Sequence, residues 1–174
     1  MKRFLFLIGM PGSGKSTWGR EASIAFNLPF IDLDEYIEQT EGTTISQIFQ
    51  NKGEEAFRDI ESAALNSVIT SIRAFTVVSC GGGTPLRPTN MAAMKEHGVV
   101  VYLKAPLDVL TSNIGNDPLK NRPLLYGKAD LMLPLDDIYQ QRKGVYEQAH
   151  HIFDIRKLSI ADFEPILKQC IEQG

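Results

Sequence analysis

Five short apolar runs alternate with segments of helical periodicity along this chain of 174 residues, and this alternation restricts the folds open to it. The runs are rich in valine, isoleucine and phenylalanine, and they are Phe4–Ile8, Pro29–Leu33, Phe75–Cys80, Val99–Leu103 and Ile152–Ile155. Short, nearly continuous apolar strands are typical of a parallel sheet whose two faces are covered by crossover helices. The sequence therefore predicts a three-layer α/β fold.

The segments between these runs predict the helices. We expect them at Lys15–Phe26, Glu54–Arg73, Thr89–Glu96, Leu107–Asn113 and Asp136–Ala149, with a short helical stretch at Ile45–Gln50 and a last helix that ends at Gln173. Asp162 followed by Pro165 favours the start of that last helix, because proline is tolerated in a first turn. The length and the 43% hydrophobic content predict one domain over residues 1–174.

Composition excludes several classes of partner. The net charge of -3 argues against binding to a nucleic-acid backbone. No apolar run approaches the roughly 20 residues of a membrane-spanning helix, and the apolar start of the chain is interpreted as a buried strand. Cys80 and Cys170 lie far apart and outside any CxxC pattern, which suits a reducing compartment. We expect a cytoplasmic protein without nucleic-acid or membrane partners.

A glycine-rich segment between the first strand and the first helix has the composition of a phosphate-binding loop. Residues 9–17 read GMPGSGKST and fit the pattern GxxxxGK[ST] in the context that this motif requires. Backbone N–H groups and the helix N-terminus would face an anion, Lys15 would reach the β- and γ-phosphates, and Ser16 would offer a hydroxyl to Mg²⁺. The alternative is a glycine-rich turn with an incidental lysine. The loop predicts a nucleoside triphosphate and leaves the reaction open.

Two aspartates follow the second predicted strand, where ligands of open α/β sheets bind. As i, i+2 neighbours at a strand end, Asp32 and Asp34 are expected to project to one side while Leu33 enters the core. Asp32 suits the metal, directly or through water, and Asp34 suits an acceptor hydroxyl that it orients or deprotonates. The alternative is that these residues cap the next helix, with Asp34 placed before Glu35.

Further candidates follow along the chain. Arg58 and Glu61 are i, i+3 neighbours on one predicted helical face, a common surface arrangement that also lets a carboxylate steady a guanidinium. The third predicted strand ends in Gly81, Gly82 and Gly83, and three successive glycines favour close approach of another group to the backbone, such as a small substrate. Glycine also serves plain turns.

A long segment without clear periodicity, Gly115–Leu133, is interpreted as a lid over the site, with a solvated connection as the alternative. Arg122 lies in this segment, and closure would bring its charge toward the transferred phosphoryl group. Arg142 follows on the next helix, four residues before Tyr146, and its guanidinium suits a carboxylate bound by two parallel hydrogen bonds. The sequence leaves open whether Arg58 and Arg142 converge.

Seven motifs together resemble the shikimate kinase family over nearly the whole chain. In order along the sequence they are GMPGSGKSTWGR, PFIDLDEYIE, GEEAFRDIE, SCGGGTPLR, VVVYL, NRPLL and QRKGVYEQA. The resemblance implies ATP-dependent phosphorylation of the 3-hydroxyl of shikimate, a step toward chorismate and the aromatic amino acids. It also implies a monomeric P-loop fold with five parallel strands in the order 2-3-1-4-5 and helices on both faces.

The resemblance carries over to individual positions. It implies that ATP is bound by Gly12, Ser13, Gly14, Lys15, Ser16 and Thr17, and that Mg²⁺ is held by Ser16 and Asp32. It implies shikimate binding by Asp34, Arg58, Gly82 and Arg142, with Gly81 and Gly83 beside them, and a lid arginine at Arg122. The chain departs from the pattern at Asn113, where many relatives carry an arginine near the adenine, and Arg156 is a substitute candidate.

Two other functions remain open from the residues alone. Kinases of other small metabolites, such as gluconate, share the P-loop but need not combine Arg58, the triple glycine and Arg142. A regulatory module that binds ATP without transferring phosphate is the second, although Lys15, Asp34 and Arg122 argue against it.

Overall fold

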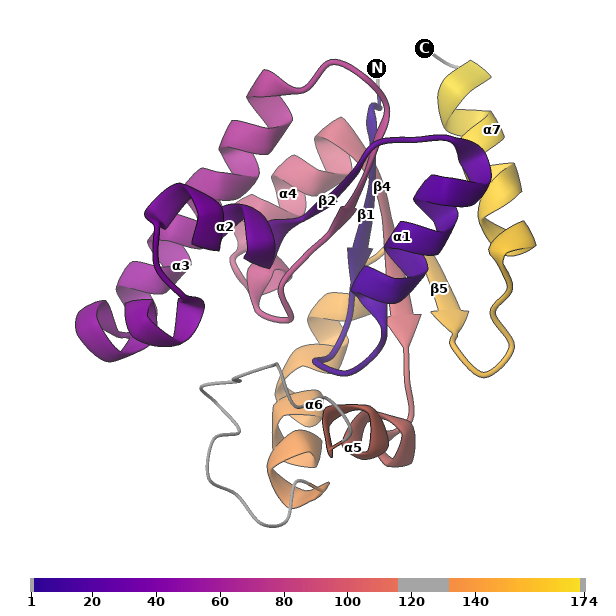
Figure 1. Ribbon diagram of the computed structural model, residues 1–174. Helices are drawn as coiled ribbons and strands as arrows, with labels where there is room; N and C mark the ends of the chain where they lie inside the picture. Colours follow the sequence, from indigo (N-terminus) through magenta and orange to yellow (C-terminus); the bar gives the residue numbers. More distant parts are fainter. Residues whose placement is uncertain (1, 116–131, 173–174) are drawn as a thin grey trace.

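A computed structural model describes residues 2–115 and 132–172 of the chain (Figure 1). One sheet contains all five predicted strands, now β1 (Phe4–Ile8), β2 (Phe30–Asp32), β3 (Thr76–Ser79), β4 (Gly98–Lys104) and β5 (His151–Asp154). Every pairing is parallel, and the strand order is β2-β3-β1-β4-β5. The predicted α/β fold and the strand order 2-3-1-4-5 are confirmed.

Seven helices connect and cover the strands within the described residues. They are α1 (Lys15–Phe26), α2 (Leu33–Glu41), α3 (Ile45–Ser71), α4 (Pro88–His97), α5 (Leu107–Gly115), α6 (Met132–Tyr146) and α7 (Glu164–Glu172). The described part of the chain also contains two short 3-10 helices, η1 (Thr84–Leu86) and η3 (Ile160–Phe163). The predicted bounds of α1 and the predicted start of α5 are confirmed, and the other bounds of α4, α5 and α6 differ by one to four residues.

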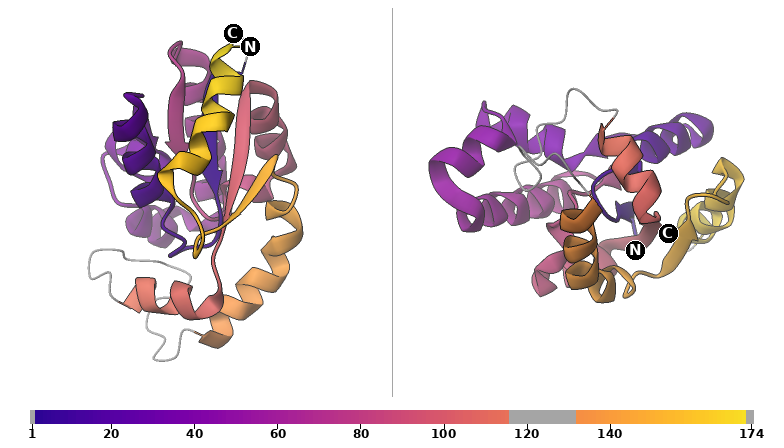
Figure 2. Two further views of the ribbon diagram at one scale, coloured as in Figure 1. Left: turned by 90° about the vertical axis from the view of Figure 1, so that its right-hand side faces the viewer. Right: turned by 90° about the horizontal axis from the view of Figure 1, so that it is seen from below.

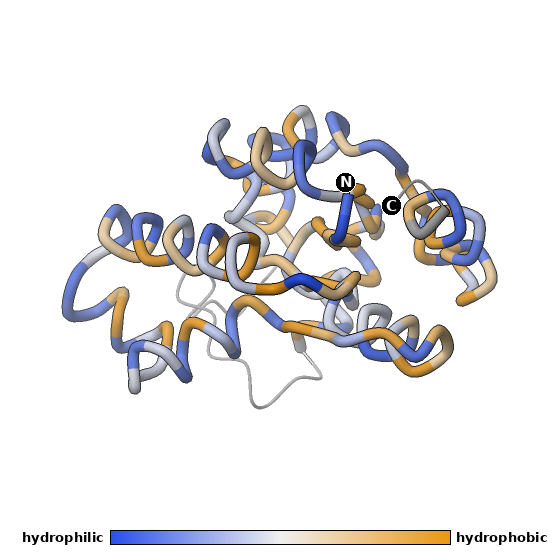
Figure 3. The backbone as a smooth tube through the Cα atoms, turned by 90° about the horizontal axis from the view of Figure 1, so that it is seen from above, coloured by the Kyte–Doolittle hydropathy of each residue, from blue (hydrophilic) through white to orange (hydrophobic). Residues whose placement is uncertain are grey.

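Two apolar cores lie on the two faces of the sheet, because side chains of a strand alternate between faces. Phe4, Phe6 and Ile8 of β1 pack with α2, α3, α4 and α6 on one side. Leu5 and Leu7 pack with α1 and α7 on the other. Figure 1 shows these two helical layers on either side of the sheet, and Figure 3 shows hydrophilic and hydrophobic residues alternating along the helical turns.

The segment after β2 differs from the prediction. The second strand ends at Asp32, and α2 starts at Leu33, so Asp32 and Asp34 are not i, i+2 neighbours on a strand. The reason is local hydrogen bonding, since one carboxylate oxygen of Asp32 accepts the backbone N–H groups of Asp34 and Glu35. The predicted helix cap exists, but Asp32 forms it and Asp34 lies in the first helical turn.

Two other helices differ in extent. The predicted helices Ile45–Gln50 and Glu54–Arg73 are confirmed as two helices that share the label α3, because Gly53 between them is non-helical, with φ 82° and ψ 174°. The second of them ends at Ser71 rather than at Arg73. The last helix starts at Glu164 rather than at Asp162, because Asp162 belongs to η3 and caps it in a reciprocal pair with Ser159. The predicted end at Gln173 lies outside the described residues.

Parallel pairing brings the carboxyl ends of the strands to one edge of the sheet. Leu7 of β1 is level with Ser79 of β3, and Ile8 is level with Tyr102 of β4. Both views of Figure 2 place α5 and α6 at this edge, next to the loop between β1 and α1. Among the described residues, no helix combines the length and the apolar character that crossing a membrane requires.

A hydrogen bond of His150, directly before β5, predicts how the free energy of unfolding depends on pH. The Nδ1 atom of His150 accepts the backbone N–H of Val100 at 3.0 Å, so the ring must be neutral at that nitrogen. Partial burial and the charges of Lys2 and Lys95 lower the pKa of His150 below its ordinary value of 6.5. Below pH 6.5 the unfolded chain therefore binds the proton first, and stability falls until the pH passes the folded pKa.

We expect the free energy of unfolding of the wild type to drop more than that of His150→Asn between about pH 7.5 and pH 5.5, because asparagine keeps an acceptor without titrating. Urea unfolding at several pH values measures the difference. Parallel pH dependences of the two proteins would contradict the role given to His150.

Candidate active site

The loop between β1 and α1 has the shape of an anion-binding cradle. Gly12 and Gly14 adopt φ values of 83° and 81°, which L side chains rarely reach, and α1 begins directly after them at Lys15. The loop is braced from inside by Lys15, which is buried and whose Nζ donates to the carbonyl oxygens of Gly9 at 3.1 Å and Met10 at 3.0 Å. An ammonium group is thus held within the loop, beside the N-terminus of a helix.

Three oxygen-bearing side chains from three elements meet beside this loop. The hydroxyl of Ser16 donates to Asp32 Oδ2 at 2.5 Å and lies 3.3 Å from the hydroxyl of Ser79. Hard oxygen ligands of this kind suit Mg²⁺, which commonly binds one or two carboxylates together with phosphates and water. Ser79 was missed by the sequence interpretation, although its place as the last residue of β3, before the triple glycine, was a usable signal.

The buried carboxylate of Glu61 binds two side chains next to the triple glycine. Glu61 on α3 is 1% exposed and accepts hydrogen bonds from Arg58 Nη1 at 2.9 Å and from the Thr84 hydroxyl at 2.6 Å. Arg58 also pairs with Glu54 at 3.2 Å and lies over the ring of Phe57. The predicted pairing of Arg58 with Glu61 is confirmed, but the pair is buried at Glu61 rather than a solvated surface contact.

The triple glycine lies against charged side chains of the protein itself. A Cβ on Gly83 would overlap the guanidinium of Arg58, and one on Gly82 would lie 3.0 Å from Pro11 and 3.4 Å from Arg142 Nη1. The prediction that another group closely approaches this backbone is confirmed. Arg58 and Arg142 therefore both adjoin one turn, which the sequence had left open.

Asp34 completes this side of the site. A Cβ on Gly81 would lie 2.9 Å from Asp34 Oδ1 and 2.7 Å from Glu61 Oε1, so two carboxylates flank the first glycine of the turn. Pro11 of the phosphate-binding loop reaches the next glycine. The carboxylate of Asp34 thus lies beside the same glycine turn that Pro11 and the two arginines adjoin.

Buried aromatic residues lie beneath the turn. Tyr146, at the end of α6, is fully buried, stacks on Tyr102 with ring centroids 5.1 Å apart, and donates its hydroxyl to the carbonyl of Gly82 at 2.6 Å. Tyr146 was noted in the sequence only by its spacing from Arg142. Cys80 is also buried here, and burial raises the pKa of its thiol, which disfavours the reactive thiolate.

The last turns of α5 pack against the phosphate-binding loop. Asn113 Nδ2 donates to the carbonyl of Gly12 at 2.8 Å, and a Cβ on Gly12 would meet Ile114 at 2.9 Å. Arg156 forms an ion pair with Asp108 at 2.6 Å in the first turn of the same helix. Arg122 and most of the predicted lid, Gly115–Leu133, lie outside the described residues.

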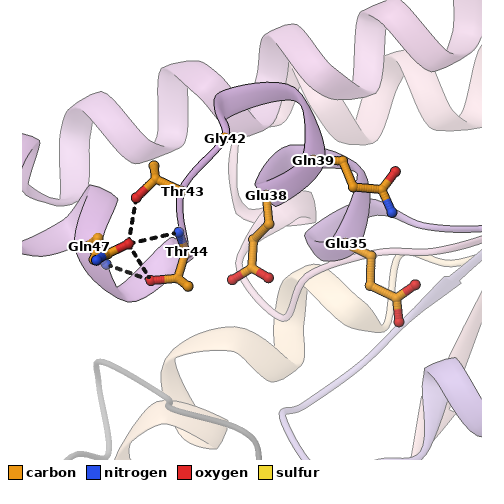
Figure 4. A pocket seen from close by; sticks show the side chains of 7 residues that line it. All are labelled: Glu35, Glu38, Gln39, Gly42, Thr43, Thr44 and Gln47. Carbon is orange, nitrogen blue, oxygen red and sulfur yellow. Dashed lines mark hydrogen bonds between the residues drawn. The ribbon is translucent and has the colours of Figure 1, made fainter.

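A pocket elsewhere contains none of the predicted site residues (Figure 4). It is lined by Glu35, Glu38, Gln39, Gly42, Thr43, Thr44 and Gln47, at the connection between α2 and α3. Gln47 bonds with Thr43 and Thr44, and Glu38 accepts the backbone N–H of Ile45. These polar groups stabilise the connection itself.

Comparison with known proteins decides the family. The sequence model named shikimate kinase matches residues 11–172. The chain belongs to the shikimate kinase family. It is 37% identical to the shikimate kinase of Dictyoglomus turgidum, over 99% of this chain and 98% of that protein, and 38% identical to that of Clostridium botulinum, over 98% of both.

A solved structure agrees with the sequence matches. The shikimate kinase of Acinetobacter baumannii in complex with shikimate superposes with a TM-score of 0.86 at 31% identity, covering 100% of this chain and 96% of that one. The chain is therefore an ATP-dependent phosphotransferase, and the predicted enzyme class and family are confirmed.

The burial of Glu61 generates a test with a matched control on the same helix. Glu61→Ala leaves Arg58 and Thr84 without their buried partner, and we expect a loss of about 3–5 kcal/mol in the free energy of unfolding. Glu54→Ala removes a carboxylate from the same arginine, but Glu54 is 56% exposed, and we expect a loss below about 1 kcal/mol. Urea unfolding measures both, and equal losses would refute the distinction.

Proposed function

We propose that this chain transfers the γ-phosphate of ATP to the 3-hydroxyl of shikimate, at the edge of the sheet where the phosphate-binding loop adjoins the glycine turn. The observation that carries the proposal is the convergence of Arg58 and Arg142 on that turn, with Asp34 beside it. One carboxylate and several hydroxyls on a small ring are the groups that such a site suits.

The two arginines are proposed to hold the carboxylate of shikimate. A guanidinium binds a carboxylate through parallel hydrogen bonds, and lysine cannot reproduce that geometry. Glu61 and Thr84 hold Arg58 in place, while Gly82 and Gly83 leave room for both arginines. Gly81, Gly82 and Gly83 would then form the floor on which the ring of shikimate packs.

The phosphoryl donor is proposed to lie along residues Gly12 to Thr17. Its phosphates would receive backbone N–H groups at the start of α1 and the ammonium of Lys15, which would exchange the carbonyl oxygens of Gly9 and Met10 for phosphate oxygens. Arg122 is proposed to add positive charge from the lid. Arg156 is the candidate for contact with the adenine, because Asn113 stands where many relatives carry an arginine.

Asp34 is proposed to act on the attacking hydroxyl. The 3-hydroxyl oxygen forms a bond to the γ-phosphorus while the bond from that phosphorus to the β,γ-bridging oxygen breaks, and ADP leaves. Asp34 orients the hydroxyl or accepts its proton during the attack. Its place beside the glycine turn, which Pro11 of the phosphate-binding loop and both arginines also adjoin, supports either role.

Ser16 and Asp32 are proposed to hold Mg²⁺, and the oxygen cluster that they form with Ser79 fits this ion. When bound, Mg²⁺ neutralises charge on the β- and γ-phosphates. We also propose that the enzyme acts as a monomer of one domain in the cytoplasm, as the sequence predicts. The large exposed apolar side chains of the described residues, Ile24, Met132, Leu133 and Ile152, come from three separate elements, which supports a monomer.

The proposed reaction predicts ADP release that depends on shikimate. Purified protein with Mg·ATP should release ADP when shikimate is added, and not with quinate, gluconate or no acceptor. Asp34→Asn keeps the shape of the side chain but removes its charge and basicity, so we expect kcat to fall by about 100-fold or more. A coupled ADP assay measures both effects.

Each other outcome of this assay has a definite meaning. Turnover of gluconate alone would replace shikimate as the acceptor and keep the kinase chemistry. Tight ATP binding without turnover of any acceptor would support the non-catalytic module. Full activity of Asp34→Asn would remove Asp34 from the proposed chemistry.

The double role of Asp32 allows its metal function to be separated from its capping function. Asparagine caps helices about as well as aspartate, so Asp32→Asn should change the free energy of unfolding by less than about 0.5 kcal/mol. Because it lacks the negative charge, the same variant should need about tenfold more Mg²⁺ for half-maximal activity. A titration of activity with Mg²⁺ measures this requirement, and urea unfolding is the control for stability. An unchanged Mg²⁺ requirement would contradict a metal role for Asp32.

A further inference from the structure

The hydroxyl of Tyr146 connects the two halves of the site. It donates to the carbonyl of Gly82 at 2.6 Å and lies 3.9 Å from the sulfur of Met10, in the phosphate-binding loop. Tyr146 is fully buried at the end of α6, one helical turn after Arg142, and its ring is held by stacking on Tyr102. A rigid, buried donor is thus aimed at the backbone of the glycine turn.

The phenol is in its donating form at neutral pH. Burial raises the pKa of Tyr146 from its ordinary value of 10.0, and the positive charge of Arg142 offsets only part of this shift. The carbonyl of Gly82 therefore faces a permanent O–H donor, in a part-buried hydrogen bond whose donor side chain is fully buried. A hydrogen bond is stronger in such surroundings than in water.

Three successive glycines need external restraint, because each can adopt a wide range of backbone conformations. The carbonyls of Gly81 and Gly83 accept backbone N–H groups, from Thr84 at 3.1 Å and Leu86 at 3.0 Å. For the middle carbonyl, that of Gly82, the donor is the side chain of Tyr146. Because a peptide bond is planar and trans, holding this carbonyl also sets the direction of the Gly83 N–H.

We propose that Tyr146 is a positioning residue for the acceptor. Its hydroxyl holds the peptide between Gly82 and Gly83 in the orientation in which the turn lies against Arg58 and Arg142 and receives shikimate. The inference rests on the proposed function, since the turn is the proposed floor of the acceptor site. It adds a buried residue that touches neither substrate and acts through the backbone of the turn.

Tyr146→Phe tests the proposal by removing one oxygen while the ring and its stacking on Tyr102 remain. We expect the KM for shikimate to rise about tenfold, with the KM for ATP within about twofold of the wild type. The dissociation constant of shikimate, measured by calorimetry without ATP, should rise by the same factor. A general loss of stability would not separate the two substrates in this way.

Tyr36→Phe is the matched control, because it removes a phenol hydroxyl that bonds Ser67 at 3.0 Å between α2 and α3. We expect its KM values for both substrates to equal those of the wild type. An unchanged KM for shikimate in Tyr146→Phe, equal rises for both substrates, or the same rise in Tyr36→Phe would overturn the inference while the wild type still phosphorylates shikimate. A wild type that fails to bind and phosphorylate shikimate would overturn the proposed function, and the inference with it.

Discussion

The central position of β1 is the constraint on which the site depends. All five of its residues are fully buried, and it pairs in parallel with β3 on one side and β4 on the other. Neighbouring strands lie about 4.8 Å apart, so the loops that leave β1 and β3 start side by side. One is the phosphate-binding loop and the other is the glycine turn, which explains how Pro11 comes to touch Gly82.

Charged groups lie next to both of these loops. Lys15 and the start of α1 provide a positive environment for phosphate, while the carboxylates of Glu61 and Asp34 lie beside Gly81 of the glycine turn. The buried Glu61 is stabilised only because Arg58 and Thr84 bond both of its oxygens, since an isolated buried carboxylate would be strongly unfavourable. The same carboxylate restricts the conformation of Arg58. The ion pair that stabilises buried Glu61 therefore also sets the geometry of the proposed acceptor site.

Sequence interpretation succeeded where the signal is local. The strands are recognisable from apolar runs, α1 from its helical period, and the phosphate-binding loop from glycines at fixed spacing. The pair Arg58 and Glu61 follows from i, i+3 geometry within one helix. The start of α2 was missed because a strand end and a helix cap both place aspartates at this spacing, and the choice depends on which N–H groups Asp32 accepts.

The sequence by itself determined the fold class, the phosphate-binding loop and the family, because periodicity and motif spacing are properties of neighbouring residues. The tertiary structure decided that Arg58 and Arg142 converge, that Ser79 joins Ser16 and Asp32, and that Tyr146 holds Gly82. Arg142 and Gly82 lie 60 positions apart in the sequence, and Tyr146 lies 64 positions from Gly82. Their distances in space follow from how helices pack on the sheet, and no local pattern encodes that packing.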